Sequence, residues 1–89
     1  MIRKIINFGE MGALSARSAA ALVQAASKYS SRILIEQGSK VVNAKSLMGV
    51  LSLNVGSLDA MQLVLDGSDE TEACDDLHGL IQNRFSAIA

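Results

Sequence analysis

The stretch that decides the fold is Val42-Asn-Ala-Lys-Ser-Leu-Met-Gly-Val-Leu-Ser-Leu53, which runs from the end of a strand into a short helix. The extended run ends over residues 43–45, and Ser46 then precedes a cluster of apolar residues. A serine in that position accepts a hydrogen bond from an amide of the first helical turn and so acts as an N-cap. The pattern therefore predicts a helix over residues 47–53 that begins after Ser46.

This predicted helix is too apolar to be fully buried. Five of its seven residues are apolar, whereas a short helix turns only part of its surface to a core. With Val50 and Leu53 pointing inward, an exposed apolar patch remains, formed by Leu47, Met48 and Leu51. Such patches with methionine often mark a partner surface. Two interpretations of Ser46 follow: a plain cap, or a functional serine that tolerates a phosphate at the amino end of its helix.

The residues before this stretch predict a strand and a longer helix. Residues 2–8 alternate between two faces, with Ile6 and Phe8 on the inner one. Ser15 is placed to cap a helix that ends near residues 28–29. The apolar positions of that helix follow helical spacing: Ala19, Leu22, Val23 and Ala26.

Three further strands are predicted around the central stretch. Residues 32–37 and 40–44 flank Gly38-Ser39, a two-residue connection typical of a tight hairpin. After a loop over residues 54–59, residues 61–66 alternate as a fourth strand.

A third helix closes the pattern. It is predicted to begin at the capping residue Ser68, with acidic residues in its first turn and Arg84 in its last. Its buried stripe is predicted to contain Ala73, Leu77, Leu80 and Ile81. The order β-α-β-β-α-β-α indicates a two-layer α+β sandwich with helices on one face of the sheet and solvent on the other.

Length and composition limit the possible classes of protein. The 89 residues are 49% hydrophobic, which favours one folded domain over residues 1–89. Eight basic and nine acidic residues, no basic tract and three aromatic residues argue against direct nucleic-acid binding. The first residues contain neither a signal peptide nor a membrane span, so we expect a cytoplasmic protein without membrane association. A single cysteine excludes an internal disulfide and a cysteine-based metal cluster.

For several titratable residues the sequence favours a structural role over a catalytic or metal-binding role. His78 is expected to be a surface or partly buried helix residue, and Cys74 a packing residue, since neither has a motif beside it. The acids of the third helix favour a solvated face over a metal site: Asp69, Glu70, Glu72, Asp75 and Asp76. No metal and no cofactor is expected.

Three segments of the chain match a known family: Ser15-Ala-Arg-Ser-Ala19, Ala26-Ser-Lys-Tyr29 and the segment from Val42 to Leu53. With them the chain resembles HPr, the small phosphocarrier of the bacterial sugar phosphotransferase system, over nearly its whole length. Ser15-Ala-Arg-Ser-Ala19 resembles the active-site motif His-Ala-Arg-Pro-Ala, and Ala26-Ser-Lys-Tyr29 ends the first helix as in that family. The segment from Val42 to Leu53 resembles the regulatory-serine segment. The resemblance implies an open-faced sandwich with strand order 1-4-2-3 and three helices on one face.

The main departure from the family is Ser15, which lies where HPr has its phosphorylated histidine. An imidazole accepts and returns a phosphoryl group readily, whereas a serine phosphate is a stable ester. The resemblance therefore implies that the carrier reaction is absent. Ser18 replaces the proline, Ala13 a glycine and Leu58 a loop glycine. Together these changes favour a naturally diverged paralogue over a chain altered only at position 15.

A histidine-less HPr that keeps the regulatory serine is the pattern of Crh, a paralogue in the catabolite repression of Gram-positive bacteria, which has glutamine in place of Ser15. This likeness implies a regulator and not an enzyme. Ser46 would be phosphorylated by HPr kinase/phosphorylase with ATP, and the product would be a corepressor for CcpA, a repressor of the LacI type. Arg17 would pair with the phosphate or with an acid of the partner. The docking patch would be Leu47, Met48 and Leu51.

Other hypotheses stay open at this point. One alternative is a degenerate HPr-fold module that binds a partner without phosphorylation. Another is a phosphocarrier that uses Ser15 or His78, which the stability of serine esters argues against. For the oligomeric state we expect a monomer or a weak homodimer, since the paralogue can exchange its first strand.

Overall fold

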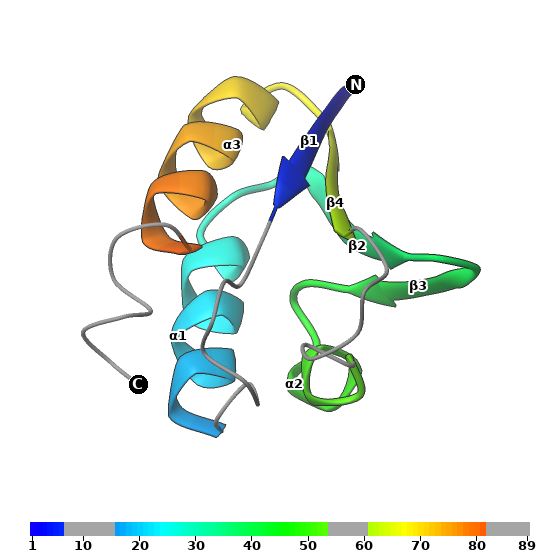
Figure 1. Ribbon diagram of the computed structural model, residues 1–89. Coiled ribbons are helices and arrows are strands. Elements are labelled where there is room, and N and C mark those ends of the chain that lie inside the picture. The colour runs from blue at the N-terminus through cyan, green and yellow to red at the C-terminus, as the bar shows by residue number, and fades with distance from the viewer. Residues whose placement is uncertain (7–15, 54–60, 82–89) are drawn as a thin grey trace.

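The computed structural model describes residues 1–6, 16–53 and 61–81. In chain order the elements are β1 (Ile2–Ile6), α1 (Ala16–Ser27), β2 (Arg32–Gln37), β3 (Lys40–Asn43), α2 (Leu47–Leu51), β4 (Met61–Asp66) and α3 (Glu70–Gly79). The predicted order of strands and helices is confirmed (Figure 1). The predictions on Phe8, Ser15 and Arg84 lie outside the described residues.

All strand pairs are antiparallel, and the sheet order is β1-β4-β2-β3. The register places Leu34 of β2 between Val64 on β4 and Asn43 on β3. The β2–β3 turn contains Gly38, whose φ of 60° lies in the region that glycine adopts without a steric penalty. The strand order 1-4-2-3 expected from the resemblance is therefore confirmed.

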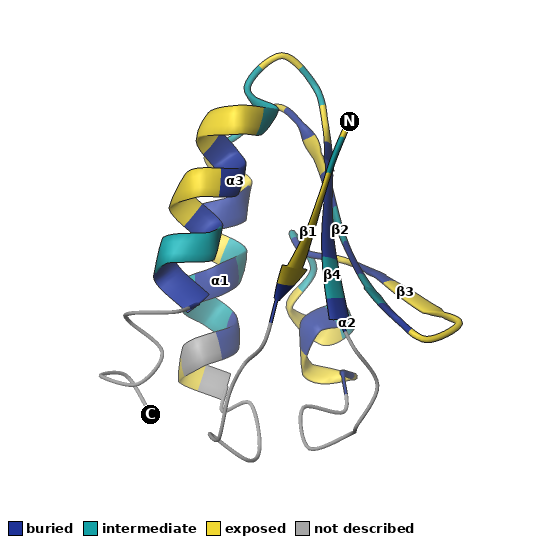
Figure 2. Ribbon diagram, turned by 45° about the horizontal axis from the view of Figure 1, so that its top comes forward, coloured by how far each residue is buried: buried dark blue, intermediate teal, exposed yellow. Residues whose placement is uncertain are grey.

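The helices cover one face of this sheet. In Figure 2, α1 and α3 lie side by side against the sheet, and α2 sits by the end of β3. The inward strand residues alternate as a half-buried sheet requires, and Ile33, Ile35, Leu63 and Leu65 are fully buried. Leu22 of α1 and Leu77 of α3 meet them in the core. The open-faced α+β sandwich predicted from the sequence is confirmed.

No helix of the described residues covers the opposite face of the sheet (Figure 2). That face carries a network of polar side chains. Nη1 of Arg3 donates to Oε1 of Glu36 at 2.7 Å and to Oε1 of Gln62 at 3.4 Å. These contacts reach from β1 across β4 to β2. Exposed apolar side chains remain toward the two edges, Ile5 on β1 and Val41 on β3.

Two predicted helix boundaries are wrong. The short helix ends at Leu51, with Ser52 as its C-cap, so Leu53 follows the helix and does not belong to it. The third helix has Asp69 and not Ser68 as its N-cap. Asp69 makes no capping hydrogen bond with its side chain, because its carboxylate is bound to another element.

That carboxylate ties the start of α3 to the start of β2. It accepts hydrogen bonds from the backbone amides of Ser30 and Ser31, at 2.9 and 3.0 Å, and from both serine hydroxyls. Hydrogen bonds to the ionised form stabilise it, and those from Ser31 and Ser30 lower the pKa of Asp69 from 3.8 to about 2.

This contact predicts a specific loss of stability in acid. Because the folded pKa of Asp69 is depressed, its contribution is present above pH 3.8 and is lost as pH falls toward about 2. We expect Asp69→Asn to be less stable than wild type at neutral pH and to approach it in that acid window. Urea unfolding across the window measures this. Asp75→Asn, a change at an exposed acid of α3, is the control. The prediction would be contradicted if the free energies of unfolding of Asp69→Asn and wild type differed by the same amount at every pH in the window.

Candidate functional site

The corner between β3 and α2 places Ser46 at the start of its helix. Its backbone amide donates to the carbonyl of Asn43 at 3.0 Å, and the amide of Lys45 donates to Oδ1 of the same asparagine at 2.9 Å. Oγ of Ser46 accepts from the amide of Gly49 at 3.3 Å. The predicted N-cap is confirmed, and Ser46 as a whole is half-buried.

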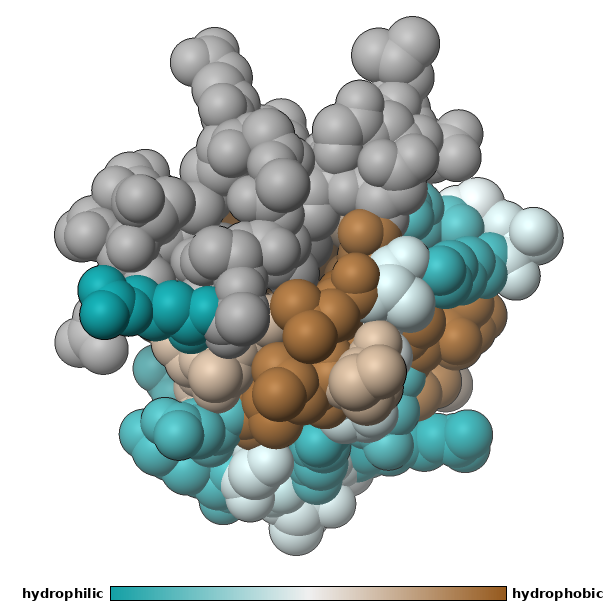
Figure 3. Space-filling model, turned by 90° about the horizontal axis from the view of Figure 1, so that it is seen from below, coloured by the Kyte–Doolittle hydropathy of each residue, from teal (hydrophilic) through white to brown (hydrophobic). Residues whose placement is uncertain are grey.

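The apolar residues of the α2 segment divide between core and solvent as predicted. Val50 is fully buried, and Leu53 is 7% exposed. The exposed fractions of Leu47, Met48 and Leu51 are 40%, 77% and 38%. We call these three residues the α2 patch. Figure 3 looks onto this end of the molecule and shows apolar side chains at the surface, bordered by hydrophilic ones.

Two lysines hold the corner in place. Nζ of Lys45 donates to the carbonyl of Tyr29, just past the end of α1, at 2.7 Å. Nζ of Lys40 donates to the carbonyl of Ser52, the C-cap of α2, at 2.6 Å. Cations stabilise the carbonyl ends of helices, so each lysine binds where the backbone carries partial negative charge. Neither contact is predictable from the sequence, because no local pattern links residues so far apart in the chain.

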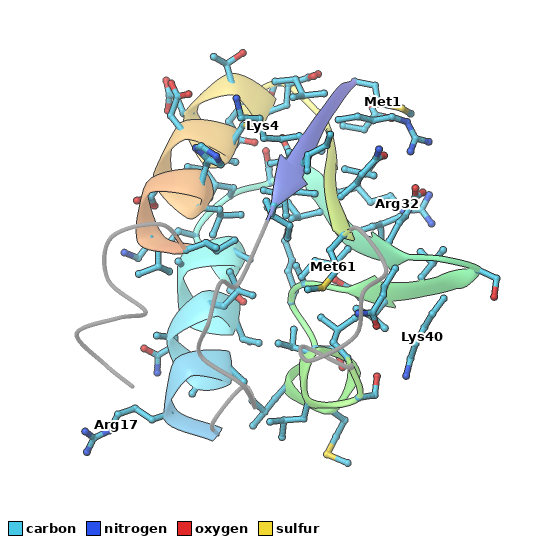
Figure 4. All side chains as sticks on the ribbon, viewed as in Figure 1. Met1, Lys4, Arg17, Arg32, Lys40 and Met61 are labelled. Carbon is cyan, nitrogen blue, oxygen red and sulfur yellow. The ribbon has the colours of Figure 1, made fainter. Side chains whose placement is uncertain are left out.

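Arg17 does not meet Ser46 in this structure. It lies exposed in the first turn of α1, at the same end of the molecule as α2. Figure 4 shows its side chain pointing away from α1 on the side opposite to α2. In this orientation the Arg17 side chain does not point toward Ser46, so it is not positioned to pair with a phosphate there. Its contact with an acid of a partner stays a prediction, and Ser15 lies outside the described residues.

The titratable residues for which the sequence favours a structural role lie on α3 or at its start. Cys74 is buried, and this burial raises the pKa of its thiol. His78 is half-buried in the last turn. Asp76 accepts a hydrogen bond from the hydroxyl of Tyr29 at 2.8 Å, which contributes most to raising the pKa of that phenol to about 12. Within the described ranges, no three His, Cys, Asp or Glu side chains gather as a metal site requires.

None of the described helices has the length and apolar character needed to cross a membrane.

Comparison with known proteins identifies the family of this fold and site. The family model of the PTS HPr component phosphorylation site matches residues 4–83. The HPr-like protein Crh of Halalkalibacterium halodurans is 42% identical over 82 residues, which cover 92% of this chain and 98% of the relative. The chain therefore belongs to the HPr family.

Solved structures agree with this assignment. The crystal structure of HPr-C-His from Thermoanaerobacter tengcongensis superposes with a TM-score of 0.86 at 43% identity, covering 97% of each chain. Crh of Bacillus subtilis, solved as a dimer with a swapped domain, gives a TM-score of 0.72 at 36% identity, covering 92% of this chain and 94% of that one. Within the family the chain is close to Crh, and it is a carrier-type or regulatory protein and not an enzyme.

Proposed function

We propose that this protein, as a single HPr-like domain, is a regulator that HPr kinase/phosphorylase phosphorylates on Ser46 with ATP. The product would act in the cytoplasm as corepressor of a CcpA-type repressor of the LacI family in carbon catabolite repression. The single observation that carries the proposal is the arrangement of α2. It presents a half-buried serine hydroxyl directly before three apolar side chains that face solvent.

The position of Ser46 suits a modification site. Among the described residues its hydroxyl oxygen accepts one hydrogen bond, from the amide of Gly49, and the other hydrogen bonds of the corner do not use that oxygen. The corner is held instead by Asn43 and the two lysines, Lys40 and Lys45. A phosphate on Ser46 therefore leaves the backbone of the corner intact while it adds negative charge and three acceptor oxygens beside the α2 patch.

The α2 patch suits docking of a protein partner. Its side chains face solvent although they are apolar, while the core role of the segment falls to Val50 and Leu53. A partner that buries the patch removes apolar surface from water at about 25 cal/mol per Å². An acidic group of the same partner would find Arg17 exposed at this end of the molecule. The patch and the phosphate together would distinguish the modified protein from the unmodified one.

The sequence argues against a carrier function. Ser15 stands at the position of the phosphohistidine, and a serine phosphate does not pass its phosphoryl group on readily. A homodimer through an exchanged first strand remains part of the proposal, because the relative from Bacillus subtilis is a dimer with a swapped domain.

Calorimetric binding to a purified CcpA-type repressor tests the proposal. We expect the protein phosphorylated on Ser46 to bind, and both the unmodified protein and kinase-treated Ser46→Ala to bind at least about tenfold more weakly, which corresponds to 1.4 kcal/mol. Equal binding of modified and unmodified protein would contradict phosphorylation control. That result would favour a binding module that uses the exposed α2 patch without phosphate.

A further inference from the structure

We propose that Met48 is a redox-sensitive residue, and that a peroxide converts its thioether to the sulfoxide and so weakens docking at the α2 patch. The effect on docking rests on the function proposed above, whereas the site of oxidation does not. The starting observation is the position of the sulfur. Met48 lies in α2, two residues after Ser46, and is 77% exposed.

The other described methionines differ from Met48 in burial or in place. Met61 faces the core and is 4% exposed, so peroxide reaches it only when the sheet opens. Met1 is exposed, but Figure 4 shows it beside the start of β1, at the opposite end of the molecule from α2. Oxidation of a thioether follows its accessibility. Met48 is thus the accessible methionine of the docking surface among the described residues.

The chemical step needs only the thioether and a peroxide. A lone pair of the Met48 sulfur attacks one oxygen of hydrogen peroxide, an S–O bond forms and the O–O bond breaks. The second oxygen leaves and takes up the proton of the first, which gives water. The sulfur loses two electrons and the peroxide gains them. A sulfoxide of this kind is reversible, since cells reduce it back to the thioether.

Oxidation of Met48 changes the polarity of the α2 patch and so affects docking. Met48 is the most exposed residue of the α2 patch, and the sulfoxide of its thioether is a strongly polar hydrogen-bond acceptor. A partner that covers this atom must remove water from it without a prepared donor. The fold does not depend on the same atom, because Val50 and Leu53 make the core contacts of the segment. Oxidation therefore changes recognition and leaves the fold intact.

The test exposes the protein to hydrogen peroxide, removes the peroxide with catalase and maps oxidised peptides by mass spectrometry. The initial rate of phosphorylation by HPr kinase/phosphorylase and ATP is then measured. We expect Met48 to oxidise before Met61, the melting temperature to stay unchanged, and the rate to fall at least about tenfold. In Met48→Leu, which keeps an apolar side chain without sulfur, the ratio of rates after and before treatment should stay near one.

Each other outcome overturns a defined part of the proposal. Oxidation of Met61 as fast as Met48 overturns the assignment of the site. An unchanged rate after complete oxidation of Met48, or an equal loss in Met48→Leu, overturns its role in docking. If the wild-type protein accepts no phosphate before any peroxide treatment, the proposed function is overturned, and the proposed effect of oxidation on docking is overturned with it. The peptide map then still decides whether Met48 is the preferred site.

Discussion

Met48→Lys is expected to lower the affinity of the phosphorylated protein for its repressor, and the rate of its phosphorylation, at least about tenfold each. The substitution places an ammonium group in the centre of the exposed α2 patch, where a partner would have to remove water from it. The melting temperature should stay unchanged, because the side chain of Met48 is 77% exposed and the core is filled by Val50. Calorimetry and kinase assays measure the two effects.

Val41→Lys is the matched control for that change. Val41 is also an exposed apolar residue, but it lies on β3 and outside the α2 patch. We expect Val41→Lys to bind the repressor and to react with the kinase as wild type does. Equal losses in both variants would indicate a general effect of added charge. If Met48→Lys lost neither affinity for the repressor nor phosphorylation rate, the α2 patch would not be part of the docking surface.

Gly67→Ala is expected to destabilise the fold by about 1–3 kcal/mol. A Cβ atom at Gly67 would lie 2.6 Å from the Cα of Ser31 and 2.5 Å from its Oγ. The first of these atoms belongs to the backbone, so the start of β2 must move away from the end of β4. That movement would also disturb the hydrogen bonds from Ser31 to Asp69. We expect the melting temperature to fall by at least about 4 °C.

Gly79→Ala provides the opposite result at a second glycine. Gly79 is the last residue of α3. Among the described residues, a Cβ there would meet no atom within 4 Å beyond its chain neighbours and the backbone of its own helix. Alanine is up to about 1 kcal/mol better than glycine inside a helix. We therefore expect Gly79→Ala to be as stable as wild type or slightly more stable. Thermal unfolding followed by circular dichroism compares the two variants, and similar melting temperatures would contradict the close contact at Ser31.

Local pattern was sufficient to predict most of the fold. The alternation in β4, the two-residue connection between β2 and β3 and the helical spacing in α1 depend only on residues close in the sequence, and all four elements form. The orientation of the α2 segment was also predictable, because five apolar residues cannot all face the core from one short helix. The exposed and buried sets agree with that argument.

The wrong N-cap of α3 and the contacts that the sequence did not predict share one physical cause. Serine is a favoured N-cap residue, yet the N-cap of α3 is Asp69 and not Ser68. The carboxylate of Asp69 accepts hydrogen bonds from amides that lie 38 and 39 residues earlier in the chain. The contact of Lys45 with Tyr29 likewise joins parts of the chain that only the folded sheet and helices bring together. Such contacts depend on tertiary geometry, so no local pattern encodes them.

The most direct test of the proposed function is the intact mass of the protein after incubation with HPr kinase/phosphorylase and ATP. Ser46→Ala is treated in parallel, and a third sample receives phosphoenolpyruvate and enzyme I in place of the kinase. We predict one phosphate on the wild type and none on Ser46→Ala or in the third sample. No phosphate on the wild type, or a phosphate that persists in Ser46→Ala, would contradict regulation through Ser46. A phosphoryl group from phosphoenolpyruvate would instead reveal a carrier.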